Sequence, residues 1–308
     1  MKHYATIYIF CMGLFCITIC NLYADQQKIL ILNTRQGVSK YDIVIHHFRN
    51  NISYPITELN LSSAHMTSGK MQSICAKPDI KLIYCVGSKA CKVSFPFHSN
   101  KIIVFSSVIN WQHIFPKKTN NISGVSNEFN SEMLLTLFRL FVAEIDDIGI
   151  IYSDQYNKEW IAELKSNAKK VNISIIAKKI SQRQMFYQTM KNLLKKIKVF
   201  WLISDPVVMT NKNHLHEITY LCNQYNVPIF SYNSVFIDYG VTLTVSSDLP
   251  TVGGQAASIA NNIMADNELL NKIQYPAGSY ISVNMSLVKK YHLNLNNNAY
   301  GLINNIKE

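Results

Sequence analysis

Small polar side chains follow most of the apolar segments of this chain, and their chemistry suits non-covalent binding of a small molecule. The carboxylate of Asp205, directly after the apolar segment 199–203, can accept hydrogen bonds from an ammonium group. Hydroxyls and backbone N–H groups can donate to a carboxylate, and tyrosine rings can stack on an apolar group. The candidate ligand-binding residues are Thr34, Gly87, Ser88, Ser106, Ser153, Tyr156, Asp205, Tyr232 and Asn233.

The same residues also have a purely structural interpretation, because polar side chains after a strand often cap the next helix. Asp205, which precedes Pro206, suits that role as well as it suits a ligand. The chain contains no GxSxG, GxGxxG, HExxH or P-loop motif. A Ser/His/Asp trio can be assembled from distant residues, so composition alone leaves it open. We expect a binding protein and not an enzyme.

Histidines and cysteines give no pattern typical of a metal site, and we predict neither a metal nor a cofactor. Two histidines that are adjacent or two residues apart do not share a helix face, as in His46-His47 and His214–His216. The cysteines lack CxxC spacing. In an oxidising compartment we expect one disulfide among the first three of Cys75, Cys85, Cys91 and Cys222, with the pairing left open.

The elements that must position the polar candidates alternate regularly along the chain. Apolar segments predict strands at 28–32, 82–86, 102–105, 148–152, 199–203 and 228–230, with helical patterns between them. Near-continuous apolar strands that alternate with amphipathic helices indicate parallel sheets covered on both faces. Ligands of such sheets bind outside the carboxyl ends of the strands, which is where the polar candidates lie.

The N-terminal residues predict export. Lys2 and His3 precede a largely apolar run, and Ala24 is a small residue before a cleavage point, so we interpret residues 1–24 as a signal peptide. A retained membrane anchor is disfavoured because the run is shorter than the ~20 residues of a span. A lipoprotein linked through Cys20 is disfavoured because a lipobox requires a small residue where Ile19 stands.

Length and charge set wider limits. About 284 of the 308 residues follow the signal peptide, enough for two hydrophobic cores. The formal net charge of +11 is compatible with nucleic acid, an acidic membrane face or an anionic ligand. The basic residues are scattered apart from one cluster at 191–198. We therefore predict no nucleic-acid partner and interpret the charge as a solvated surface.

The most specific pattern runs from Val227 to Ala265. A short strand, Val227–Phe230, is followed by the segment Val235–Gly240, by Asp248 and by Gly254-Gln255-Ala256-Ala257. Further matches in order are NISGV at 121–125, FWLISDPVVMT at 200–210 and ISVN at 281–284. With this order and spacing the chain resembles the substrate-binding proteins of ABC importers, in the branch that includes tryptophan and tyrosine binders. The resemblance extends weakly from Lys28 and more clearly from Asn121 onward.

This resemblance implies the type I periplasmic-binding architecture, an α/β fold of two doubly wound parallel-sheet lobes joined by three hinge crossings. Carried onto this chain, the crossings fall near Ser123, at Ser231–Ser234 and at Tyr280–Val283. Lobe one then comprises residues 25–122 and 234–280, and lobe two comprises residues 123–233 and 281–308. The ligand is expected between the lobes, where hinge closure buries it.

The resemblance also implies a function. It predicts a monomeric periplasmic protein that binds a small ligand and hands it to the membrane permease of an ABC transporter. Asp205 stands at the position of the family's aspartate, which favours an amino-acid-like ligand, whereas Arg35 in the first cleft loop suits an anion. A periplasmic sensor or accessory protein that signals to a membrane partner is the alternative. The ligand stays open, and neither tryptophan nor tyrosine is predicted.

Overall fold

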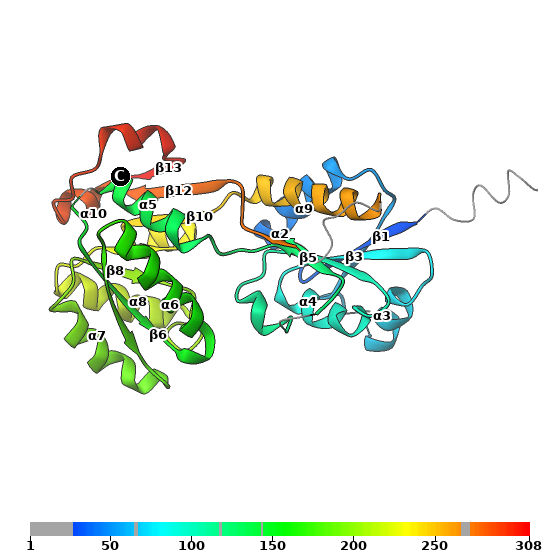
Figure 1. The fold of residues 1–308 in the computed structure, drawn as a ribbon, viewed down its shortest axis with the longest axis horizontal. Helices are drawn as coiled ribbons and strands as arrows, with labels where there is room; N and C mark the ends of the chain where they lie inside the picture. The colour runs from blue at the N-terminus through cyan, green and yellow to red at the C-terminus, as the bar shows by residue number, and fades with distance from the viewer. Residues whose placement is uncertain (1–26, 65–66, 117–118, 143, 266–271) are drawn as a thin grey trace, which may run out of the picture.

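The computed structural model describes residues 27–64, 67–116, 119–142, 144–265 and 272–308. They form two α/β lobes, each built on its own sheet and connected by extended segments (Figure 1). The predicted signal peptide, residues 1–24, lies outside the described residues. Within the described ranges, no helix has the length and apolar character needed to cross a bilayer.

The first lobe contains a fully parallel sheet with strand order β11-β5-β4-β3-β1-β2. Along β1, Ile29 and Ile31 pack into one core with α2 and α9, and Leu30 and Leu32 pack into the other core with α3 and α4. This alternation produces the continuous apolar run that predicted a sheet covered on both faces. The strands are β1 (Lys28–Asn33), β2 (Ile56–Asn60), β3 (Ile80–Val86), β4 (Ile102–Ser106), β5 (Ile122–Val125) and β11 (Ile273–Gln274). The helices are α2 (Ser39–Asn51), α3 (Ser68–Cys75), α4 (Ser88–Ser94) and α9 (Leu249–Met264).

The second lobe contains a sheet with strand order β13-β12-β10-β9-β8-β6-β7. It is parallel from β7 to β10, whereas β12 runs antiparallel to β10. Helices α5, α6 and α10 cover one face, and α7 and α8 cover the other. The strands are β6 (Asp147–Tyr152), β7 (Ser174–Lys179), β8 (Val199–Leu202), β9 (Ile229–Ser231), β10 (Leu243–Ser247), β12 (Ser279–Asn284) and β13 (Asn305–Lys307). The helices are α5 (Ser131–Phe141), α6 (Asp154–Lys170), α7 (Phe186–Leu194), α8 (Lys212–Gln224) and α10 (Met285–Lys290).

All six predicted strands form, with ends within two residues of the prediction. The lobe boundaries, however, differ from the predicted ones. Residues 122–125 pair in the first sheet, and residues 243–247 and 279–284 pair in the second. The crossings therefore lie at 126–130, at Asp248 and at 275–278. The 3₁₀ helices are η1 (Phe95–Phe97), η2 (Trp111–His113), η3 (Arg183–Met185), η4 (Ser234–Tyr239) and η5 (Asn297–Leu302).

The largest correction concerns residues 234–247, which the sequence analysis placed in lobe one. The polar residues Ser231-Tyr232-Asn233 end β9, but the chain does not leave the lobe there. Helix η4 instead returns the chain so that β10 pairs parallel with β9. A left-handed Gly240, with φ of 93°, ends η4 and permits that turn.

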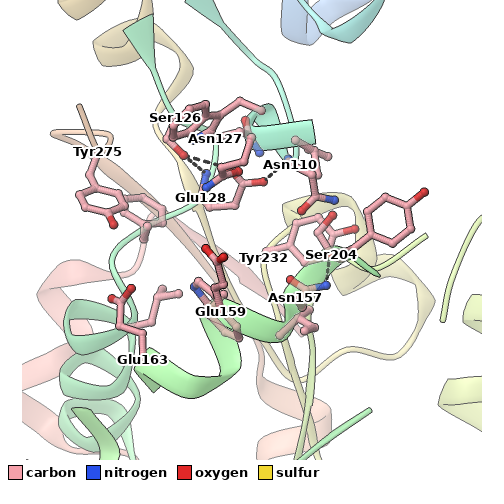
Figure 2. A pocket seen from close by; sticks show the side chains of 18 of the residues that line it. Asn110, Ser126, Asn127, Glu128, Asn157, Glu159, Glu163, Ser204, Tyr232 and Tyr275 are labelled. Atoms are coloured by element: carbon pink, nitrogen blue, oxygen red, sulfur yellow. Dashed lines mark hydrogen bonds between the residues drawn. The ribbon is translucent and has the colours of Figure 1, made fainter. Parts of the chain in front are cut away.

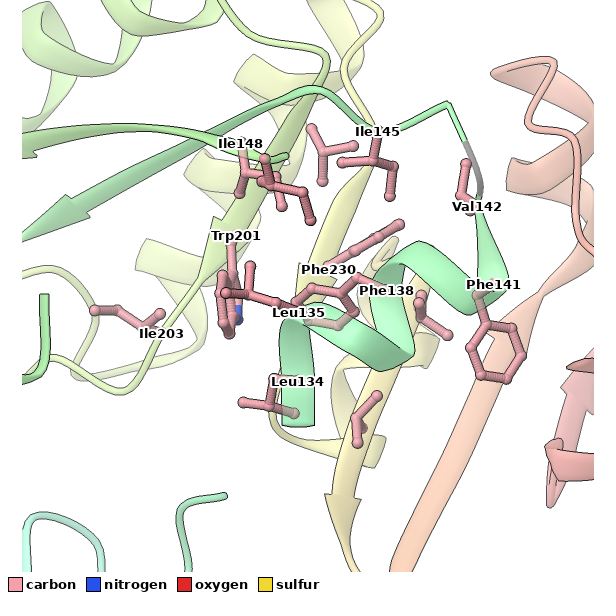
Figure 3. Packing of buried hydrophobic residues seen from close by; sticks show 14 of the residues in the cluster. Leu134, Leu135, Phe138, Phe141, Val142, Ile145, Ile148, Trp201, Ile203 and Phe230 are labelled. Atoms are coloured by element: carbon pink, nitrogen blue, oxygen red, sulfur yellow. The ribbon is translucent and has the colours of Figure 1, made fainter. Parts of the chain in front are cut away.

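An aromatic cluster in the second lobe packs α5 against the sheet (Figure 3) and also contacts α6 through Trp160. The ring of Phe138 meets Trp201 edge-on at a centroid distance of 4.8 Å and lies 5.0 Å from Phe230. Trp160 meets the other side of the cluster, 5.4 Å from Trp201. Each such pair adds ~0.5–1.5 kcal/mol beyond its buried area. The cluster therefore holds the cavity-facing side of α6 in a fixed orientation.

Candidate functional site

A cavity of about 540 Å³ lies between the two lobes, beside the first and third crossings. Residues 109–113 and Ser126 line it from the first lobe, and the start of α6 with the ends of β8 and β9 lines it from the second. Small-molecule sites have volumes of ~300–1,000 Å³ and favour domain interfaces. Size and position therefore make this cavity the candidate ligand site.

Glu128, on the first crossing, lines the cavity with a carboxylate (Figure 2). Its Oε1 accepts a hydrogen bond from the backbone N of Asn110 at 2.6 Å, and its Oε2 accepts one from Ser126 Oγ at 2.9 Å. The backbone N of Glu128 donates in turn to Ser126 Oγ at 3.0 Å. These contacts orient the carboxylate from the first lobe and leave further lone pairs for a ligand.

The electrostatics of the site centre on this carboxylate. Burial raises the pKa of Glu128 above its ordinary value, although the hydrogen bonds from Asn110 and Ser126 oppose the rise. Burial also raises the pKa of Tyr232 to about 12, and the charge of Glu128 adds to that rise. The pKa of Tyr275 is raised by burial and then by the charges of Glu163 and Glu128. The two carboxylates and the two phenols thus share one electrostatic environment.

Helix α6 supplies the second-lobe wall of the cavity. Tyr156, Glu159, Trp160 and Glu163 follow the spacing that places residues on one helix face, and all four line the cavity. Ser131 Oγ, at the start of α5, donates to Glu163 Oε1 at 3.2 Å. The ring of Tyr156 also reaches across to His113 of η2, at a centroid distance of 4.8 Å. The lobes therefore already touch at one edge of the cavity.

Of the nine predicted site residues, Tyr156 and Tyr232 line the cavity. They come from α6 and from the end of β9, so the prediction that strand-end residues of lobe two face the ligand site agrees with the geometry at these positions. Their role in binding a ligand remains a prediction.

Asp205, the predicted ammonium acceptor, does not line the cavity. Its side chain is buried, and its carboxylate accepts from Ser153 N at 2.7 Å, Asn157 Nδ2 at 2.8 Å and Val207 N at 2.8 Å. Ser153 Oγ donates to both of its oxygens, at 3.0 and 2.9 Å. Protein donors thus occupy both oxygens, so Asp205 and Ser153 connect the loops after β6 and β8 to α6 instead of facing a ligand.

The remaining five predicted residues also lie outside the cavity lining, and the side chains of three of them bond within the protein. Thr34 Oγ1 accepts from Ala90 N at 3.1 Å, and Gly87 precedes α4 with a left-handed φ of 88°. Ser106 Oγ pairs with the buried Tyr84 hydroxyl at 2.6 Å. Asn233 caps η4 by accepting from Val235 N at 3.2 Å. Ser88 begins α4, in the same loop as Gly87.

Two motif residues of the segment 227–265, Asp248 and Gln255, bond to the crossings and do not line the cavity. Asp248 caps α9 through Thr251 N at 3.0 Å, and its own N donates to Gly278 O at 3.0 Å. Gln255 Nε2 donates to Tyr275 O at 3.0 Å, and its Oε1 accepts from Ala277 N at 3.1 Å. The second crossing is therefore bonded to the third, and Gln255 helps to position Tyr275 at the cavity.

The expected disulfide is absent: the four cysteines in the described part of the chain are buried free thiols (Cys75, Cys85, Cys91 and Cys222). They pack as small apolar residues in the cores, and Cys85 Sγ donates to Ser94 Oγ at 2.9 Å. Among the described residues, no cluster of three or more His, Cys, Asp or Glu side chains could hold a metal ion.

Sequence reasoning missed Glu128, Trp160, Glu163 and Tyr275. Glu128 lies three residues beyond β5, a position equivalent to that of Asp205 beyond β8, and this equivalence was the available signal. Glu163 and Trp160 lie within a helix, where an acidic or aromatic side chain has no distinguishing pattern. Tyr275 lies on the third crossing, which the sequence analysis placed a few residues further along the chain.

Comparison with known proteins gives a consistent result. A structure of a ligand-free, open substrate binding protein with adhesive properties from Clostridium difficile superposes with a TM-score of 0.70 at 18% identity, covering 91% of this chain and 99% of that one. A Streptococcus pneumonia ABC domain in complex with L-Trp superposes with a TM-score of 0.62 at 12% identity, covering 92% of this chain and 100% of that one. At these identities the superpositions establish the fold.

Sequence comparison establishes the family. A tyrosine-binding protein from Clostridioides difficile (strain R20291) is 22% identical over 217 residues, which are 67% of this chain and 62% of that protein. The alignment therefore spans less than two thirds of that relative. The family model for ABC transporter substrate binding proteins matches residues 50–300. A lobed fold, an interlobe cavity and this match over most of the chain lead to one conclusion: the chain belongs to the ABC transporter substrate binding protein family.

Proposed function

We propose that this protein binds an amino-acid-like ligand in the interlobe cavity and delivers it, outside the cytoplasm, to the membrane permease of an ABC importer. The observation that carries the proposal is the Glu128 carboxylate, held by first-lobe donors and facing a cavity with aromatic walls. A ligand ammonium that donates to Glu128 forms a charge-assisted hydrogen bond, worth ~1.5–3 kcal/mol. The rings of Tyr156, Trp160 and Tyr232 then contact the ligand side chain.

The relatives support this choice of ligand class. One is named for tyrosine and another was solved with L-Trp, and both ligands carry an α-ammonium group and an aromatic ring. Arg35, which suggested an anion, is exposed and lies outside the cavity lining. The cavity thus favours the amino-acid-like ligand over the anionic one.

Thermal unfolding of the protein, refolded to remove bound ligand, tests the proposal against each of the common amino acids. A ligand at 100 times its dissociation constant adds ~2.7 kcal/mol. For a lobe-sized cooperative unit this corresponds to a Tm increase of roughly 5–10 °C. A response that disappears in Glu128→Gln supports binding at the cavity, whereas a flat response to every amino acid contradicts the ligand class. Loss of labelled-ligand uptake in a deletion strain then separates import from sensing.

A further inference from the structure

The charge of the cavity wall is opposite to that of the whole chain. The chain carries a formal net charge of +11, yet one lining residue in the described ranges, Lys158, carries an ammonium and four carry carboxylates (Glu128, Asp154, Glu159 and Glu163). Asp154 is paired with Lys179 at 2.9 Å. Glu128 and Glu163 make no ion pair with any residue in the described ranges. These two carboxylates therefore lack a protein counter-charge.

The two carboxylates belong to different parts of the hinge region. Glu128 comes from the first crossing and Glu163 from α6, and Figure 2 shows their side chains apart from each other, with Glu159 between them in this view. The charges of both carboxylates raise the pKa of Tyr275, after the larger effect of its burial, which places all three groups within electrostatic range. Each carboxylate has a protein hydroxyl donor that orients it, Ser126 for Glu128 and Ser131 for Glu163.

Glu163 is exposed in this structure, so the cost of an uncompensated carboxylate there arises when hinge closure removes water from both side chains. A zwitterion with a single ammonium compensates one of them and places its own carboxylate in a negative field. A ligand with two separated cations compensates both. The rings of Trp160, Tyr232 and Tyr275 offer apolar surface for the methylene groups between such cations, and they also favour nearby positive charge.

We propose that the cavity selects a ligand with two positively charged ends, one bound by Glu128 and the other by Glu163. This inference rests on the proposed function and adds the charge of the ligand to it. A dibasic amino acid and a linear diamine share this chemistry. Both are distinct from the neutral aromatic amino acids named for the relatives.

Isothermal titration calorimetry of the ligand-stripped protein with matched probes tests the inference. L-lysine, L-norleucine and cadaverine share a carbon chain, but norleucine lacks the terminal ammonium and cadaverine lacks the carboxylate. L-tyrosine is the fourth probe. We expect lysine or cadaverine to bind at least ~10-fold more tightly than norleucine and tyrosine. Tighter binding of lysine than of cadaverine identifies a dibasic amino acid as the ligand. Tighter binding of cadaverine identifies a diamine.

Two variants locate the second cation. Glu163→Gln should reduce affinity for the dicationic probe to within about threefold of the affinity for norleucine. The affinity for norleucine should itself change less than twofold. Glu132→Gln, on the exposed start of α5 and outside the cavity lining, removes the same charge and should leave every affinity unchanged. Unfolding without ligand shows that both variants fold.

The outcomes separate this inference from the proposed function. If norleucine or tyrosine binds as tightly as lysine and cadaverine, or if Glu163→Gln keeps the dication preference, the two-cation ligand is wrong and amino-acid binding stands. Binding of cadaverine alone supports the two-cation ligand and contradicts an amino-acid ligand. If no probe binds and the set of common amino acids is also inactive, both proposals fail.

Discussion

Asp205 and Glu128 are carboxylates placed three residues beyond the end of a parallel strand, one in each lobe. Donors from two loops and α6 surround Asp205, and these donors occupy both oxygens. Glu128 has one donor on each oxygen and faces the cavity. The comparison shows that position after a strand does not decide whether a carboxylate binds the protein or a ligand. What decides it is the number of protein donors that the neighbouring loops supply.

The largest expected effect is on stability, and it comes from removing the carboxylate of Asp205, whose two oxygens are both occupied by protein donors. Asp205→Ala leaves several buried donors without an acceptor, at ~1–3 kcal/mol each, so we expect a loss of at least ~3 kcal/mol in the free energy of unfolding. Urea denaturation measures it. Asp205→Asn retains one acceptor oxygen and should lose less. If the Asp205→Ala protein keeps its stability but binds no ligand, Asp205 is a ligand-binding residue.

Removal of the Glu128 carboxylate, which faces the cavity, should instead lower the affinity for the ligand. Glu128→Gln keeps the shape of the side chain but loses the charge, so we expect affinity for an amine ligand to fall by ~10–150-fold, equivalent to ~1.5–3 kcal/mol. Calorimetry with the most tightly bound amino acid measures the loss, and Glu132→Gln serves as the control. An unchanged dissociation constant would show that the ammonium binds elsewhere.

The fold was predictable because strand periodicity and helix amphipathicity are local properties. The apolar runs at 28–32 and 148–152 form strands β1 and β6 as expected. The lobe assignment of residues 234–247 was not predictable, because it depends on η4 returning the chain so that β10 pairs with β9. The same holds for the candidate site. Tyr156 and Tyr232, predicted from their position after strands, line the cavity, whereas the hydrogen-bond donors that surround Asp205 become apparent only when β6, β8 and α6 are packed together.

The serine hydroxyls that donate to Asp205 and Glu128 provide a second comparison of the two carboxylates. Ser153→Ala removes a buried hydroxyl from Asp205, and we expect a loss of ~1–2 kcal/mol in the free energy of unfolding. Ser126→Ala removes the equivalent donor from Glu128, but the open cavity admits water as a replacement, so its loss should stay below ~1 kcal/mol. Thermal unfolding of the two variants under identical conditions compares them. Equal losses would mean that the cavity excludes water at Glu128.

The smallest expected effect is a pH dependence that distinguishes Glu128 from ordinary carboxylates. Because burial raises its pKa in the folded state, the folded protein holds this proton more tightly than the unfolded chain does. The resulting stabilisation is fully present below the unfolded pKa of ~4.3 and is lost as pH rises through the folded pKa. Glu128→Gln has no proton to lose. Without ligand, its Tm relative to that of the wild type should therefore rise between pH 4 and pH 7, which thermal unfolding of both proteins at each pH measures.

Ligand affinity should change with pH in the opposite sense, since an ammonium group binds the ionised carboxylate. In the wild type, affinity for an amine ligand should fall as pH is lowered through the raised pKa of Glu128, over the same interval in which the ligand-free wild type gains stability relative to Glu128→Gln. Parallel calorimetry and thermal unfolding from pH 4 to pH 7 measure both trends. A wild-type protein whose affinity and whose stability relative to Glu128→Gln rise together with pH would contradict this behaviour of Glu128. An affinity that rises with pH in the wild type but not in Glu128→Gln, while the stability of the wild type relative to that variant falls, would show that the same carboxylate destabilises the empty cavity and binds the ligand.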